Sequence, residues 1–435
     1  MTEASSPARR AAVVGGGIAG LATAAMLART GWEVRLFERR AAIGADATGA
    51  STTGANSTGT SADDECRRAG LGAGIQISPN AWRCLAAIGA AAAVEAATFR
   101  PHAAVLRDGV SGREIYRAAL GEAAVERWGA PYLHVHRADL VDALERVARA
   151  ACVELHPGRS VDAIEDGTDA LRLRHTAVAG GAEEMQELSA DLCILADGLG
   201  SRLRGLLFGE TPRVFTGQTA WRALVPATAG GAAAIPPDAT VWAAPGRHAV
   251  TYYVSAGRFV NLVAVEEASR WEGESWVEPG DPARLRAAFT GLHPTLTALL
   301  EEVSDPLFWG LFERPAPGSW SRGRVVMLGD AVHAMLPFMA QGAAMALEDA
   351  VVLSRALGRD QPLPEALAAF EAERRPRVER VAATSRSNGK LFHRAGPLRL
   401  AEQAVVGAVS RLAPGVAAGR LDWIYGYDAT LDRSA

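Results

Sequence analysis

The sequence contains few cysteines, and their arrangement excludes two kinds of site. Among 435 residues there are four, Cys66, Cys84, Cys152 and Cys193, and no two of them form a CxxC pair. No cluster of histidine and cysteine has the spacing of zinc ligands. We therefore expect reduced cysteines in a reducing compartment, and no metal site.

The sequence also lacks an excess of positive charge and has no long apolar run. The net charge is −4 at pH 7, which indicates no basic surface for nucleic acid. No uninterrupted apolar stretch reaches the roughly 18 residues that a membrane span needs. The apolar run after Arg9 and Arg10 resembles an export signal, but glycines interrupt it near its start and the charged stretch 33–39 follows. These features favour a buried strand and helix, so we expect a cytoplasmic protein with neither nucleic acid nor membrane as partner.

The length and the composition indicate a globular protein of several parts. With 49% hydrophobic and 22% charged residues, the chain can form two or more intergrown domains. Residues 1–215 are predicted to be a Rossmann-type, nucleotide-binding part. Residues 216–310, rich in strand-like runs, predict an antiparallel sheet, and residues 311–435 return to α/β structure and end in helices. Residues 44–70 are almost all small or polar and predict a disordered insertion, or alternatively a lid.

The first motif with chemical meaning is a glycine-rich turn. Gly15, Gly17 and Gly20 form a GxGxxG pattern between a strand-like run and an alanine-rich stretch, and Glu38 ends the next strand-like run. The first glycine allows a tight turn, the second lets a pyrophosphate approach the backbone, and the third lets helix and strand pack closely. Glu38 stands at a suitable distance to bind a ribose. The pattern predicts a dinucleotide but does not distinguish FAD from NAD(P).

A second motif near the C-terminus favours FAD. Residues 323–330 form a strand-like run that ends in Gly-Asp, followed by His333, Pro337 and Gly342. Asp330 could reach a ribityl hydroxyl, or it could only cap a helix. The helix that begins at Gly342 would direct its N-terminal dipole at the N1–C2=O edge of a flavin. His333 is expected to order the loop.

These motifs together resemble those of the class A flavoprotein aromatic hydroxylases, which share the para-hydroxybenzoate hydroxylase fold. The family pattern GDxxHxxxPxxxQG is present from Gly329 to Gly342. An Asp-Gly pair at Asp197 is similar to a third family motif, which lies near both FAD and the nicotinamide donor. Three further segments, residues 72–80, 136–140 and 423–428, are similar to segments of the salicylate and 3-hydroxybenzoate hydroxylase branch.

The resemblance implies the fold, the cofactors and the residues that bind them. It implies an α/β protein with a Rossmann-type FAD-binding domain, an inserted antiparallel β-sheet substrate domain and a helical C-terminus. NADH or NADPH would reduce FAD, and O2 would then form a flavin C4a-hydroperoxide that gives an oxygen atom to an electron-rich ring. In this branch the arginine of the HRADL-type motif contacts FAD, and that role falls to Arg137. The implied FAD-binding residues are Gly15, Gly17, Ala19, Gly20, Glu38, Arg39, Arg137, Asp197, Asp330, Pro337, Gly342 and Ala343.

Four residues of the expected sheet are candidates for contact with the substrate. Arg222 could hold a carboxylate in a bidentate manner, or could form a structural salt bridge. His248 could relay a phenolic proton, although histidines on strands are commonly structural. Tyr252 lies on the same strand-like run. Some relatives carry a histidine at the position of Gln218. A glutamine can bind a substrate but cannot act as a base, and this difference disfavours a simple hydroxybenzoate as the substrate.

The sequence therefore predicts an FAD-dependent, NAD(P)H-using monooxygenase that hydroxylates a small aromatic or heteroaromatic compound. Hydroxybenzoates, aminohydroxybenzoates and hydroxypyridine carboxylates are the expected substrates, with O2 as partner and a monomer or homodimer as the functional form. The alternatives are a tailoring hydroxylase or epoxidase for a larger polyketide- or quinolone-like product and a non-oxygenating flavin oxidoreductase. A tryptophan-type halogenase is disfavoured because its WxWxIP motif is absent. The basic run 374–377 is predicted to be a solvated helix face paired with nearby glutamates.

Overall fold

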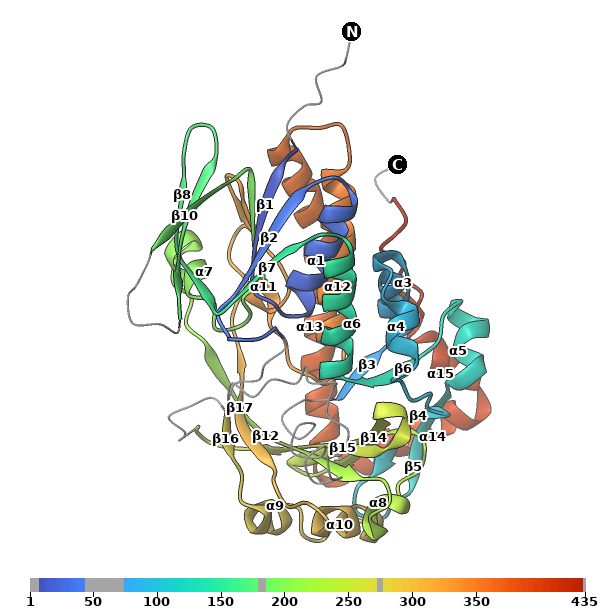
Figure 1. The fold of residues 1–435 in the computed structure, drawn as a ribbon. Coiled ribbons are helices and arrows are strands. Elements are labelled where there is room, and N and C mark those ends of the chain that lie inside the picture. The colour runs from blue at the N-terminus through green and yellow to red at the C-terminus, as the bar shows by residue number, and fades with distance from the viewer. Residues whose placement is uncertain (1–7, 44–73, 179–184, 272–276, 433–435) are drawn as a thin grey trace.

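The computed structural model describes residues 8–43, 74–178, 185–271 and 277–432 (Figure 1). The insertion predicted at 44–70 lies outside the described residues. Among the described helices, none combines the length and the apolar character that crossing a membrane requires.

A six-stranded sheet forms the upper half of the molecule in Figure 1. Its order is β18-β19-β11-β1-β2-β7, and all neighbours run parallel except β18, which is antiparallel to β19. The central strands are short apolar runs, as expected for parallel strands with both faces covered. The strands are β18 (Ser321–Arg322), β19 (Val325–Met327), β11 (Leu192–Leu195), β1 (Arg10–Val14), β2 (Glu33–Glu38) and β7 (Glu154–Pro157).

Small residues bring the helices of this half close together. Helix α1 (Ile18–Arg29) is rich in alanine and packs on β1 and β2 and against α6 (Arg137–Ala150) and α12 (Gly342–Leu357). A Cβ at Gly329 would lie only 3.0 Å from the Cβ of Ala19. Ala19 therefore brings the start of α1 against the turn that precedes Asp330.

An eight-stranded sheet forms the lower half. Its order is β16-β17-β12-β15-β14-β13-β4-β5, and only the β13–β4 pair is parallel. Side chains alternate between its faces: Trp221 belongs to a cluster with α9 (Pro282–Ala288) and α10 (Pro294–Glu301), whereas Ala220 and Val265 face Phe338. The strands are β16 (Val277–Pro279), β17 (Leu307–Glu313), β12 (Val214–Pro226), β15 (Phe259–Glu267), β14 (Arg247–Val254), β13 (Ala239–Ala244), β4 (Ala103–Asp108) and β5 (Glu114–Ala119).

The structure confirms the predicted fold class, an α/β nucleotide-binding part with a mainly antiparallel sheet and a helical C-terminus. The sheet also takes two strands, β4 and β5, from residues 103–119, which the expected range 216–310 did not include. The domain boundaries therefore stay a prediction. Helix α13 (Leu363–Phe392) contacts α12 and β18 in the upper half and β13 in the lower half, so it joins the two.

Smaller elements complete the fold. A two-stranded sheet pairs β3 (Gly74–Ile77) with β6 (Leu133–His136), and a three-stranded sheet contains β8 (Arg159–Asp166), β9 (Leu171–Ala177) and β10 (Gln186–Ala190). The other helices are α3 (Pro79–Ile88), α4 (Ala91–Glu95), α5 (Gly121–Trp128), α7 (Arg202–Phe208), α8 (Gly230–Ala233), a 3-10 turn (Ser255–Gly257), α9 (Pro282–Ala288), α10 (Pro294–Glu301), α11 (Asp330–His333), α14 (Gly396–Leu412), α15 (Pro414–Gly419) and α16 (Asp422–Tyr425).

Candidate active site

Three sequence motifs meet at one edge of the six-stranded sheet. Gly15 follows β1, Asp197 follows β11 and Asp330 follows β19, and these three strands are neighbours in the order β19-β11-β1. Because parallel strands end at the same edge, the motifs converge although they are far apart in the chain. This carboxyl edge is where open α/β sheets bind their ligands.

The glycine turn has the geometry that a pyrophosphate needs. Gly15 has φ +112°, and a Cβ there would lie 2.4 Å from the carbonyl oxygen of Ala196. A Cβ at Gly20 would lie 1.9 Å from the carbonyl oxygen of Gly15, whereas a Cβ at Gly17 would meet no atom within 4 Å. No side chain caps α1 and its first turn has no acidic residue, so its N-terminus is open to an anion.

Glu38 lies at the same edge of the sheet, at the end of β2 beside the glycine turn. Its two carboxylate oxygens accept hydrogen bonds from the backbone N–H groups of Gly16 and Arg40, each at 2.8 Å. A carboxylate has about four lone-pair sites, so it can still accept hydrogen bonds from ribose hydroxyls. The exposed Arg39 follows, and its positive charge acts on Asp197.

Asp197 has a buried carboxylate oxygen that lacks a partner. Its Oδ1 forms no hydrogen bond with any described residue, and desolvation by burial raises the pKa of the Asp197 carboxyl group to about 6. An oxygen in this state favours a hydrogen-bond donor from a ligand, and the hydroxyl groups of FAD fit that requirement. Downstream in the same motif, Arg204 is fully buried and donates to the carbonyl oxygens of Ala331 and Pro315. Arg204 therefore fastens the second motif to the third.

Arg137 and Asp330 lie near each other between the motifs. Arg137 is exposed to solvent, yet desolvation by the surrounding protein lowers its pKa and the charge of Asp330 raises it. Asp330 is exposed as well. Both of these predicted FAD-binding side chains are therefore accessible to a ligand.

The N-terminus of α12 completes the cofactor site. A Cβ at Gly342 would meet nothing within 4 Å, and Pro337 and Ala343 nearby are half-buried. The preceding Gln341 is buried and bonds Ser78 and Asn80, each at 3.0 Å. Open space in front of a fixed helix N-terminus fits the anionic edge of a reduced flavin.

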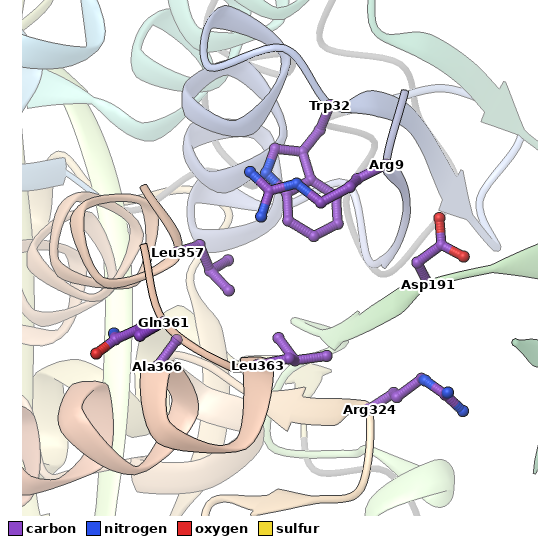
Figure 2. A pocket seen from close by; sticks show the side chains of 8 residues that line it. All are labelled: Arg9, Trp32, Asp191, Arg324, Leu357, Gln361, Leu363 and Ala366. Carbon is purple, nitrogen blue, oxygen red and sulfur yellow. The ribbon is translucent and has the colours of Figure 1, made fainter. Parts of the chain in front are cut away.

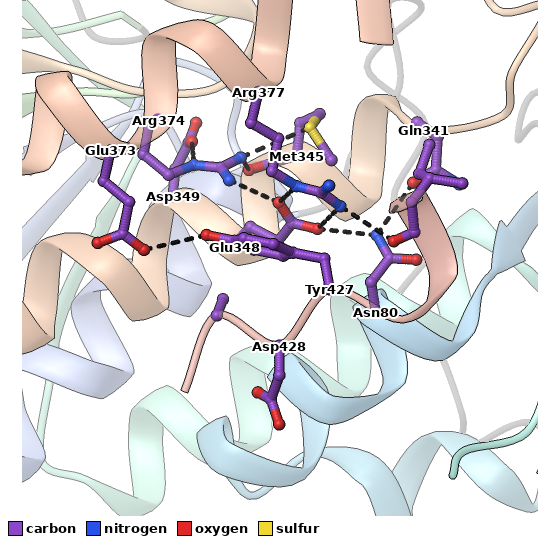
Figure 3. Close-up of polar contacts among 12 residues, drawn as sticks. Asn80, Gln341, Met345, Glu348, Asp349, Glu373, Arg374, Arg377, Tyr427 and Asp428 are labelled. Atoms are coloured by element: carbon purple, nitrogen blue, oxygen red, sulfur yellow. Dashed lines mark hydrogen bonds and ion pairs between the residues drawn. The ribbon is translucent and has the colours of Figure 1, made fainter. Parts of the chain in front are cut away.

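The prediction for the run 374–377 holds only in part. Arg375 pairs with Glu371 as predicted, but Arg374 is fully buried and binds Glu348 and Asp349 at 2.6 and 2.8 Å (Figure 3). Arg377 binds Glu348 as well, at 2.7 Å. The guanidinium groups reach α12 because α13 packs along it. As predicted, His333 orders its loop, through a 2.6 Å contact with Asp349.

One face of the eight-stranded sheet carries all four predicted substrate residues. Gln218 and Arg222 on β12 and His248 and Tyr252 on β14 share the face of Ala220 and Val265, because they have the same alternation. Their surroundings nevertheless differ. Gln218 has a buried Oε1 that forms no hydrogen bond, so it remains a candidate for binding a substrate.

Arg222 is a half-buried cation that has no counter-ion among the described residues. Its guanidinium lies 4.3 Å from the ring centroid of Trp309, and it forms no hydrogen bond or ion pair with any described residue. Its buried Nε has no acceptor. Desolvation lowers its pKa to about 10, so the group still carries its charge at neutral pH. The salt bridge considered as its alternative role is not present among the described residues.

Tyr252 and His248 are already engaged. The Tyr252 hydroxyl donates to the carbonyl oxygen of Gly74 at 2.7 Å, and burial raises its pKa. Tyr252 thus supports β3. His248 Nδ1 lies 2.7 Å from His393 Nε2, and its Nε2 has no partner among the described residues. This contact with a second histidine was not predicted.

Other residues of the site were also missed. Asn261 accepts a hydrogen bond from Gly74 N through Oδ1 and leaves its buried Nδ2 without an acceptor. It alternates with Val263 and Val265 on β15, so the period of two could have indicated its face. His393 lies at the end of α13, and no local pattern connects it with His248.

One cavity lies away from the glycine turn. Its volume is about 210 Å3 (Figure 2), and Arg9 and Asp191 place it at the amino ends of β1 and β11, opposite the glycine turn. Its other lining residues are Trp32, Arg324, Leu357, Gln361, Leu363 and Ala366. It lies at the opposite end of these strands from Gly15, Asp197 and Asp330, so it is not the expected cofactor site.

Comparisons with known proteins agree with this geometry. The profile of the FAD binding domain family matches residues 74–385, and that of the NAD(P)-binding Rossmann-like domain matches residues 13–86. The chain is 36% identical to a 3-amino-4-hydroxybenzoate 2-monooxygenase of Streptomyces platensis, over 99% of this chain and 98% of that protein. It is 36% identical to a 6-hydroxynicotinate 3-monooxygenase of Bordetella bronchiseptica, over 86% and 90%. A Klebsiella pneumoniae HpxO structure with FAD and uric acid has a TM-score of 0.75 and 25% identity, covering 95% and 97%.

Proposed function

The chain belongs to the FAD binding domain family and is an FAD-dependent monooxygenase of small aromatic compounds, and from this premise we propose that its substrate is a hydroxylated aromatic acid. The acid would lie against the pocket face of the eight-stranded sheet. Its carboxylate would bind Arg222, and its hydroxyl group would point toward His248.

The observation that carries this proposal is the unpaired charge of Arg222. The buried Nε of this half-buried group has no acceptor; a polar group that is withdrawn from water without a partner is costly, and no described residue supplies the missing anion. The planar guanidinium binds a carboxylate with two parallel hydrogen bonds. An aromatic acid therefore supplies what this site lacks, whereas a neutral ring would leave the charge unpaired.

The sheet between Arg222 and His248 suits a flat ring. Ala220 and Val265 stand opposite each other in register with His248, and Val263 pairs with Arg222. These side chains are small and apolar, and they offer dispersion contacts without polar groups that a ring would leave unsatisfied. The cation at one end and the imidazole at the other match a benzoate or pyridine carboxylate that carries a hydroxyl group.

The described residues would also hold the cofactor. When bound, FAD supplies the redox chemistry, taking a hydride from NAD(P)H and passing an oxygen atom from O2 to the ring. Gly17 and the start of α1 would receive the pyrophosphate, and Glu38 the ribose. Asp197, Asp330 and Arg137 would hold the remaining polar groups, and Gly342 would let the start of α12 approach the ring system.

Among aromatic acids, we favour one that carries an amino or ring-nitrogen group beside its hydroxyl. Two relatives at 36% identity are an aminohydroxybenzoate and a hydroxynicotinate monooxygenase, and Gln218 offers an unpaired oxygen to an N–H donor. We further propose O2 as the second substrate and a cytoplasmic monomer or homodimer as the working form.

The test is NADH and NADPH oxidation by the FAD-loaded protein with matched aromatic acids. 3-Amino-4-hydroxybenzoate, 6-hydroxynicotinate, 3-hydroxybenzoate and salicylate would each be compared with its neutral amide, and the products would be identified by mass. We expect oxidation stimulated by at least one acid, with a hydroxylated product, and little stimulation by the amides. Equal stimulation by acids and amides would exclude the carboxylate requirement.

A further inference from the structure

Beyond the pocket face, His248 connects to the protein surface through two further titratable groups. His248 Nδ1 lies 2.7 Å from His393 Nε2, and His393 Nδ1 lies 3.2 Å from Glu267 Oε1. Both histidine side chains are buried, whereas the side chain of Glu267 is 61% exposed. The three groups thus form a continuous hydrogen-bonded line from the sheet face to solvent.

We propose that His248, His393 and Glu267 form a proton path that carries the phenolic proton of the bound substrate to solvent. The proposal rests on the proposed function, because it takes the substrate hydroxyl to lie at the free Nε2 of His248. His248 would receive the proton, and His393 would be a positioning residue that acts through it.

Each step of the path balances. The substrate O–H bond breaks and Nε2 of His248 gains the proton, while its Nδ1 gives a proton to Nε2 of His393. Nδ1 of His393 then gives its proton to Glu267, which exchanges it with water. Each neutral imidazole accepts at one nitrogen and donates from the other. When a proton returns inward to the hydroxylated product, both rings regain their first tautomers.

The buried surroundings of His248 and His393 favour transfer of the proton to solvent over its retention on either ring. Burial lowers the pKa of both His248 and His393, and each charged form would be poorly solvated. A lone His248 would therefore be a weak base. With a second imidazole and an exposed carboxylate behind it, the proton does not have to rest on the buried ring. The departing proton leaves a phenolate, which makes the ring more electron-rich.

Backbone contacts hold the line of groups in place. Gly246 N donates to the carbonyl oxygen of His393 at 2.9 Å, and Glu267 N donates to that of Gly246 at 3.0 Å. Phe338 and Phe392 pack around the ring of His248 at 5.1 and 5.2 Å. The end of α13, the β14–β15 pair and the loop after Pro337 are therefore fixed relative to one another.

Neighbouring charges are engaged elsewhere. Arg247 turns away from His248 and donates to the carbonyl oxygens of Ala288 and Thr290, and Glu266 accepts from Trp221 Nε1 on the other face of the sheet. Two arginines from the end of α13 and from α14 have their own partners: Arg394 with Glu402 and Arg399 with Asp108. Lys390, the remaining cation at the end of α13, is exposed. Glu267 is thus the acid that the two histidines face.

The experiment measures proton release directly, without turnover. FAD-loaded protein would be mixed with 3-amino-4-hydroxybenzoate, and the rate of phenolate formation after a pH jump would be followed by stopped-flow absorbance. We expect His393→Gln to slow this rate at least about tenfold with little change in Kd. Glu267→Gln should slow it less, because water can replace the exposed carboxylate. Added imidazole should restore the rate in His393→Ala, which a merely structural role would not explain.

Glu266→Gln is the matched control, since it changes the neighbouring carboxylate on the opposite face and should leave the rate unchanged. If His393→Gln binds the acid normally and forms phenolate at the wild-type rate, the path is wrong while the proposed function stands. If the wild-type protein binds none of the aromatic acids, the proposed function fails, and the path fails with it.

Discussion

Arg374 Nη1 lies 2.6 Å from Glu348 Oε2, and neither side chain is exposed to solvent. The same guanidinium binds Asp349, and Glu348 also accepts from Asn80 at 2.8 Å. Asn80 in turn bonds Gln341, the residue before α12. Buried charges therefore join α13 to the helix N-terminus where the flavin is expected.

Replacing Arg374 by methionine should strongly destabilise the protein. It leaves Glu348 and Asp349 buried with one partner fewer, and breaking a buried pair in this way costs about 3–5 kcal/mol. We expect that loss in the free energy of unfolding measured by urea denaturation. The control is Arg386→Met on the same helix, whose surface pair with Glu313 should contribute at most about 1 kcal/mol. Equal losses in the two variants would contradict a special role for the buried pair.

Acid should weaken the same network through Asp349. Contacts with His333 and Arg374 outweigh desolvation and lower the pKa of Asp349 to about 2, against 3.8 for a free side chain. Since the folded-state pKa is the lower one, the carboxylate stabilises the fold above about pH 4 and this contribution is lost as pH falls toward 2. We expect Asp349→Asn to be less stable at neutral pH, on the order of 2 kcal/mol.

The stability of Asp349→Asn should also depend less on acid than that of the wild type. Denaturation midpoints measured from pH 7 to pH 3 test this. Asp142→Asn, at an exposed i,i+4 pair with Arg146, is the control and should follow the wild type. Parallel pH profiles for the wild type and Asp349→Asn would exclude the mechanism.

Local patterns explain why most of the cofactor site could be predicted from the sequence. Gly15 and Gly17 act through their own backbone geometry, and Glu38 and Asp330 stand at strand ends that apolar runs already mark. The partners of Arg374 could not be predicted in this way. In sequence it stands among Glu371, Glu373 and Glu379 at helical spacing, and only the packing of α13 on α12 directs it to buried acids instead.

The same limit applies to the substrate side. Alternation along β12 and β14 puts Gln218, Arg222, His248 and Tyr252 on one face, because the period of a strand is a local property. What each side chain contacts depends on segments far away in the chain. Tyr252 bonds Gly74 and His248 bonds His393, and no spacing rule connects such positions.

Gly17→Ala should separate cofactor binding from folding. A Cβ at this position meets no protein atom within 4 Å, so the FAD-free protein should keep its melting temperature within a few degrees. The added methyl group would occupy the space through which the pyrophosphate approaches the backbone. We expect FAD affinity to fall at least about tenfold, or roughly 1.4 kcal/mol, as measured by flavin fluorescence.

Gly20→Ala is the contrast: its Cβ would lie 1.9 Å from Gly15 O, so this variant should be less stable or fail to fold. Unchanged FAD affinity in Gly17→Ala would remove the pyrophosphate from this turn.

Arg222→Met decides whether the sheet face recognises an acid. The substitution keeps an apolar side chain against Trp309 and removes the charge, so a carboxylate ligand loses its partner while a neutral ligand loses little. We expect the affinity for 3-amino-4-hydroxybenzoate to fall by about 2–4 kcal/mol, roughly 30- to 1,000-fold, and that for its amide to change far less, both measured by calorimetry on FAD-loaded protein. Arg284→Met is the matched control, because Arg284 lies over Phe308 on the outer face of the same sheet and should affect neither ligand. If Arg222→Met weakens acid and amide equally, the arginine shapes the pocket without selecting the charge, and the substrate should then be sought among neutral phenols.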